Sequence, residues 1–114
     1  MRKQVIQDAA YEVATQVRAV EDTIDAALNE IAQLQSRIIH VNTVAGVSYG
    51  VIHPSLEKLA SAVTRLVDTR GEIVACHEAL ADAKLKVPGL REVAWGDGDP
   101  CPPASARADL RIVA

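Results

Sequence analysis

Residues 6–45 read IQDAAYEVATQVRAVEDTIDAALNEIAQLQSRIIHVNTVA, and the apolar members of this stretch recur at alternating steps of four and three. The repeating positions are Ile6, Ala10, Val13, Val17, Val20, Ile24, Ala27, Ile31, Leu34, Ile38, Val41 and Ala45. An apolar repeat that averages 3.5 residues is typical of a helix that buries one narrow stripe against another helix. We therefore predict a first helix from about Gln4 to about Ala45.

The next segment, residues 45–54, predicts a reversal of the chain. It contains Gly46 and Gly50, which release the backbone, and Pro54, whose fixed φ and missing amide proton suit the first turn of a new helix. A second helix is predicted from about Pro54 to about Val87, because the pair that follows, Pro88-Gly89, is a stop signal.

The seam of the second helix changes character halfway along. One column of the seam starts with Leu56 and Val63 and continues with three basic residues, Arg70, His77 and Lys84. If the reversal is centred near residue 50, Arg70 faces Glu30, His77 faces Thr23 and Lys84 faces Gln16. The acids Glu21, Asp22 and Asp25 lie within about a turn of these positions. We expect the basic side chains to pair with acids of the first helix and so to fix the register and the antiparallel orientation. An anion or acidic-ligand site is the alternative.

Two helices in a hairpin bury only the sides that face one another, and this chain has apolar residues beyond those sides. Leu28 and Val44 flank the stripe of the first helix, and Ile39 lies toward its back. Contiguous exposed apolar surface usually marks an interface. The predicted fold is all-α, a long antiparallel, coiled-coil-like hairpin that dimerises into a four-helix bundle. The alternatives are a hairpin covered by its own tail or by a different protein.

The regular pattern stops after Val87, so we predict a hairpin over residues 1–88 and a short irregular tail over residues 89–114. Residues 92–95 and 110–113 are short apolar segments on either side of a loop rich in Gly, Asp and Pro. They are interpreted as two short strands or as segments that pack separately on the hairpin or on a partner. The single tryptophan, Trp95, favours docking over the alternative of a disordered tail.

Composition narrows the classes of function. A formal net charge of −3 and a sequence pI near 5.5 give no basic surface for nucleic acid. No run of about 18 apolar residues occurs, so no membrane insertion is expected. The two cysteines, Cys76 and Cys101, are interpreted as free thiols of a cytoplasmic protein, and a disulfide between them is the alternative.

No arrangement of residues predicts a catalytic, cofactor or metal site. Cys76, His77 and Glu78 are adjacent on a helix, where neighbours point about 100° apart and cannot converge on one ion. With two Tyr, one Trp and no Phe, the chain also offers few rings to line a substrate pocket. The candidate interface or register residues are Glu30, Arg70, Gly71, His77, Lys84 and Trp95.

Gly71 lies in the middle of the second helix, where glycine costs about 1 kcal/mol relative to alanine. We interpret it as a point where another helix approaches closely. A tolerated weak point on an exposed face is the alternative.

In size, with two long helices and a turn near residue 48, the chain resembles the small hairpin proteins exported by type VII secretion systems. Those proteins carry a Trp-x-Gly motif at the turn. Here the corresponding residues are Ser48-Tyr49-Gly50, and the only Trp-Gly pair is Trp95-Gly96. The resemblance covers about the first ninety residues and concerns the architecture alone.

The sequence thus favours a non-enzymatic, self-associating hairpin that acts as a structural, adaptor or assembly component. A second hypothesis is a hairpin that binds a heterologous protein, as a chaperone or a secretion substrate does. A third is a small bundle enzyme or metal binder that uses Cys76, His77 and acids of the first helix.

Overall fold

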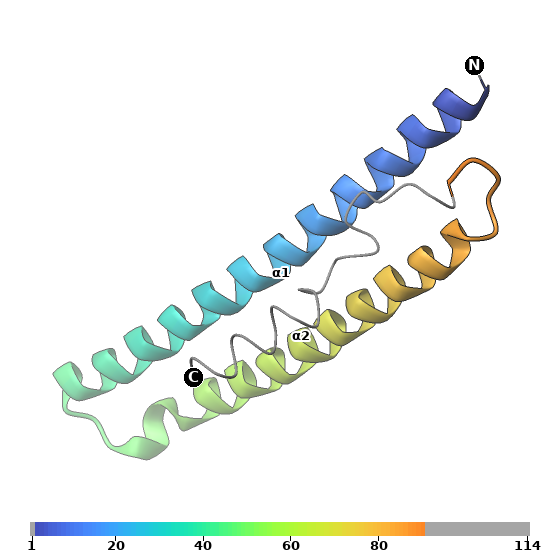
Figure 1. Cartoon of the computed structure of the whole chain (residues 1–114). Helices are drawn as coiled ribbons and strands as arrows, with labels where there is room; N and C mark the ends of the chain where they lie inside the picture. Colours follow the sequence, from blue (N-terminus) through green and yellow to red (C-terminus); the bar gives the residue numbers. More distant parts are fainter. Residues whose placement is uncertain (1, 91–114) are drawn as a thin grey trace, which may run out of the picture. The chain divides into compact units, whose positions relative to one another are not determined.

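The computed structural model describes residues 2–90 and consists of two long helices in a hairpin (Figure 1). Helix α1 spans Arg2–Ala45 and helix α2 spans Tyr49–Lys84. No strand occurs among the described residues. The predicted all-α hairpin is confirmed, whereas the predictions for residues 91–114, including the paired strands, lie outside the described residues.

The chain divides into two compact units. The first, here the terminal unit, contains residues 1–18 and 74–114, and the second, here the turn unit, contains residues 19–73. In each unit a part of α1 and a part of α2 supply the packing surfaces. Each unit is therefore built from segments far apart in the sequence.

Helix α1 ends at a glycine that adopts a left-handed backbone. Gly46 has a φ of 66°, and its amide donates to the carbonyl oxygens of Asn42 and Thr43 at 3.1 and 3.3 Å. Such a glycine satisfies carbonyls that the last helical turn would otherwise leave unpaired. The chain then re-enters a helix at Tyr49.

The start predicted for the second helix is wrong by five residues, because α2 begins at Tyr49 and contains Pro54. The first amides of a helix have no partner four residues earlier within it. At the start of α2 the amide of Val51 donates instead to the carbonyl oxygen of Ser48 at 3.1 Å. Pro54 removes only one bond, to the carbonyl of Gly50, and the helix tolerates this loss close to its end.

Helix α2 ends at Lys84, slightly before the predicted Val87. The amides of Leu85, Lys86 and Val87 each donate to the carbonyl three residues earlier, so the chain tightens here rather than continuing as an α-helix. The amide of Leu90 donates to Val87, and Gly89 has a φ of 90°. This turn brings Leu90 to a buried position, 5% exposed.

The buried face of α1 differs from the predicted stripe. Val13, Leu34 and Val41, all predicted to lie in the seam, are exposed, whereas Asn42 is buried. A straight helix has 3.6 residues per turn, so a repeat of 3.5 drifts by about 20° per heptad around the helix. Over a helix of this length the drift moves residues such as Leu34 out of the seam and brings Asn42 into it.

The buried face of α2 follows the prediction more closely. Its less exposed positions include Ile52, Leu56, Leu59, Val63, Leu66, Ile73, His77, Ala81 and Lys84. Among the apolar residues of the described chain, only Ile24 and Leu90 count as buried. The seam is therefore narrow, and most apolar side chains along it keep contact with solvent.

Candidate interaction surfaces

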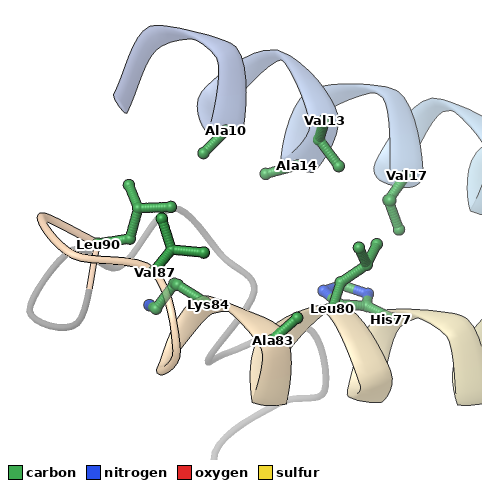
Figure 2. Close-up of a pocket in the computed structure, with 10 residues that line it drawn as sticks. All are labelled: Ala10, Val13, Ala14, Val17, His77, Leu80, Ala83, Lys84, Val87 and Leu90. Carbon is green, nitrogen blue, oxygen red and sulfur yellow. The ribbon is translucent and has the colours of Figure 1, made fainter. Parts of the chain in front are cut away.

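The terminal unit contains an apolar groove of about 180 Å³ between its two helical segments (Figure 2). From α1 it is lined by Ala10, Val13, Ala14 and Val17. From α2 and the turn that follows, it is lined by His77, Leu80, Ala83, Lys84, Val87 and Leu90. We call this feature the terminal groove.

Contacts between the turn after α2 and the start of α1 close one end of the terminal unit. The Gln7 side-chain amide donates to the carbonyl oxygen of Gly89 at 3.0 Å. Gly89 has a positive φ that strains other residues, and a Cβ atom here would lie 3.2 Å from Cγ of Lys3, which would have to shift. These contacts hold Leu90 against the groove that it lines.

The three basic residues of the predicted column occupy three different environments. Arg70 is half exposed and its Nε lies 2.8 Å from a carboxylate oxygen of Asp25. His77 is buried, only 4% exposed, and Lys84 is partly buried at the terminal groove. The column therefore does not act as one set of solvent-facing cations, because the seam takes in His77 and leaves Arg70 outside.

The hydrogen bond from Arg70 to Asp25, together with the negative charges of Asp25 and Glu21, raises the pKa of Arg70 above its ordinary value. The predicted partner was Glu30, and the observed register differs from that pairing by five residues. The cause is the early start of α2, which centres the turn near Val47 instead of residue 50. An acid of α1 does pair with Arg70, as expected, and it is Asp25.

The turn unit exposes large apolar side chains in and beside the turn. Tyr49 is 88% exposed, Val44 71% and Val41 60%. Leu34, Val47 and Val51 are also exposed. We call these six residues the turn surface. Large contiguous apolar patches are uncommon on monomers, so these exposed side chains are candidates for an interaction surface.

Asn42 is a buried polar residue that sequence reasoning missed. It is 8% exposed, and its side-chain oxygen Oδ1 is buried without a hydrogen-bond partner. Counted at 3.6 residues per turn, the apolar side of α1 passes from Ile24 through Leu28, Ile31 and Ile38 to Asn42. A count at this period would therefore have predicted that Asn42 is buried. Burial of an unpaired polar atom at this position costs free energy.

The remaining candidates divide as follows. Gly71 is exposed, and no described atom lies within 4 Å of a Cβ placed there, so the predicted close approach of another helix is not found within residues 2–90. Cys76 is an exposed free cysteine. Trp95 and Cys101 lie outside the described residues. Within the described part of the chain, no cluster of three or more His, Cys, Asp or Glu side chains is arranged to hold a metal ion.

Comparison with known proteins identifies no relative of this chain. The chain matches no known protein-family model, no curated protein and no solved structure. Neither α1 nor α2 contains a stretch long and apolar enough to cross a membrane.

Proposed function

We propose that the protein is a non-enzymatic helical hairpin that associates with a second copy of itself and acts as a structural, adaptor or assembly component. The observation that carries the proposal is the turn surface, where Val41, Val44 and Tyr49 are each mostly exposed. Burial of such side chains contributes roughly 1.5–3 kcal/mol each. The free energy gained by burying these side chains supports association through the turn surface.

The arrangement of α1 supports the same proposal. Drift of its apolar repeat leaves Leu34 and Val41 outside the seam, and these two residues lie seven positions apart in one column. A second copy that packs along this column would bury it and restore the coiled-coil-like seam predicted from the sequence. A two-fold dimer, and with it an antiparallel four-helix bundle, is the smallest closed assembly of this kind. The proposed cytoplasmic location rests on the two cysteines alone.

Charge substitution at the turn surface tests this proposal. The variant Val41→Glu/Val44→Glu adds two carboxylates to the surface, and we expect it to be monomeric at concentrations where the natural chain forms dimers. The matched control is Gln33→Glu/Gln35→Glu, which changes the charge equally at two exposed positions of α1 outside the turn surface. Light scattering after size exclusion reports the mass, and circular dichroism confirms that both variants remain helical.

Two results would argue against the proposal. One is a natural chain that stays monomeric and helical at micromolar concentration, which would favour a heterologous partner at the same surface. The other is equal dimerisation of the two charge variants, which would move the interface elsewhere.

A further inference from the structure

We propose that the terminal groove is a docking site for the chain's own segment 91–95, with the indole of Trp95 seated between Ala10 and Ala14 of α1 and Ala83 of α2. The proposal concerns the terminal unit and is independent of self-association through the turn surface. It gives the single tryptophan of the chain a defined partner surface.

Continuity of the chain is the first argument. Leu90 is the last described residue, is buried, and itself lines the groove. The turn that places it there is fixed by the bond from Gln7 to Gly89. Segment 91–95 therefore starts at the groove wall.

Reach is the second argument. Five residues in an extended conformation span at most about 17 Å at 3.3–3.6 Å per residue. Along α2, the groove runs from Lys84 back to His77, which is a rise of about 10 Å at 1.5 Å per residue. Because Leu90 itself lines the groove, a segment of this length is long enough for Trp95 to enter it.

The chemistry of the groove is the third argument. Ala10, Ala14 and Ala83 have small side chains, so the space between the helical segments stays open where larger residues would fill it (Figure 2). The other lining residues are mostly aliphatic, and an indole gains the most from leaving water for such a surface. In an extended segment Val93 and Trp95 lie on the same side, so both can face the groove.

A tethered segment also has an advantage over a free partner. A short linker gives an effective concentration in the millimolar range, which exceeds micromolar protein by about a thousandfold. The chain's own tail is thus favoured over the tail of a second copy at this groove.

Contact quenching tests the proposal, because tryptophan quenches a bimane label that it touches. Cys76 is exposed and lies seven residues before Ala83, hence on the same column of α2 as the groove wall. With Cys101→Ser, bimane on Cys76 is expected to lose emission in the natural chain and to regain it in Trp95→Phe. In the matched control the label is moved to Glu78→Cys in a Cys76→Ser background, about 200° away around α2, and Trp95→Phe is expected to change nothing.

A second readout uses the emission of Trp95 itself. Ala10→Leu fills the groove and is expected to shift the emission toward that of free tryptophan, whereas Ala9→Leu, on an exposed neighbouring position of α1, is expected to leave it unchanged. Circular dichroism checks that both variants remain helical.

Three results would overturn the proposal. These are equal bimane emission with Trp95 and with Phe, a Trp95 emission that Ala10→Leu does not move, and quenching that appears only as concentration rises. The last result would assign the groove to the tail of a second copy. All readouts are taken at dilutions where the chain is monomeric, so failure of the turn-surface proposal would leave them interpretable.

Discussion

Gly46 and Gly71 are both surrounded by open space, yet their backbones differ. Gly46 has a φ of 66°, whereas Gly71 lies within the regular helix α2. A side chain at Gly46 would be strained in the left-handed region, while a side chain at Gly71 would only reduce the freedom of the unfolded chain.

Replacement of each glycine by alanine should therefore have opposite effects. We expect Gly46→Ala to lower the free energy of unfolding by about 1–2 kcal/mol. We expect Gly71→Ala to raise it by about 1 kcal/mol. Urea titrations followed by circular dichroism measure both. A loss of stability in Gly71→Ala would indicate that another helix approaches this glycine in the assembled protein.

Asn42 allows a second prediction at the same scale. Its Oδ1 is buried without a partner, and an unsatisfied buried polar group costs about 1–3 kcal/mol. Asn42→Leu should therefore raise the free energy of unfolding, by an amount in that range. The control is Asn29→Leu at an exposed position of α1, where little change is expected. Destabilisation by Asn42→Leu would show that the amide makes a contact that the seam requires.

At the scale of the helices, the sequence predicted the positions of the helices better than it predicted which of their sides are buried. The apolar repeat correctly indicated α1 and the seam of α2, since helical periodicity is a strong local signal. It did not indicate that Leu34 is exposed and Asn42 is buried. The reason is that a repeat of 3.5 residues drifts around a straight helix, which has 3.6 residues per turn. The start of α2 differs from the prediction because Pro54 lies inside the first turns of the helix and does not begin it.

The early start of α2 explains the error in the predicted partner of Arg70. The sequence predicted a pairing between a basic residue of α2 and an acid of α1, and the contact between Arg70 and Asp25 is of that kind. The partner depends on where the turn is centred, which two glycines and a proline in ten residues leave open. The burial of His77 could not be predicted from the pattern of the column. Arg70 belongs to the same column, and it is half exposed while His77 is buried.

A charge swap tests whether this pair helps to fix the register. Asp25→Ala and Arg70→Ala should each lower the melting temperature slightly, and Asp25→Arg/Arg70→Asp should restore most of the loss. Because the pair raises the pKa of Arg70, the arginine stays charged at neutral pH, and its contribution is lost only as pH rises through the folded pKa. Salt is therefore the better probe near neutrality, and the differences should shrink as salt is added. Salt-independent differences would contradict an electrostatic role.

At the scale of the whole molecule, two apolar features remain after the hairpin has formed, the terminal groove and the turn surface. A chain with two different apolar contact sites can form open-ended assemblies, whereas a single self-complementary site gives a closed dimer. If the segment containing Trp95 occupies the groove, the turn surface alone is left for association.

This relation makes a further prediction. Trp95→Ala should leave the groove uncovered and allow a second kind of contact between copies, so that species larger than a dimer appear as concentration rises. Size exclusion with light scattering measures them. The control is Tyr49→Ala, which reduces the turn surface and should weaken the dimer without producing larger species. Larger species in both variants would mean that the groove does not limit assembly.

The central claim, association through the turn surface, is tested most directly by sedimentation equilibrium of the unmodified chain over a range of micromolar concentrations. The monomer has a mass of 12.2 kDa. Association through the turn surface should give a single reversible equilibrium between this mass and twice this mass. A mass that stays at the monomer value throughout, with the helices intact, would contradict it.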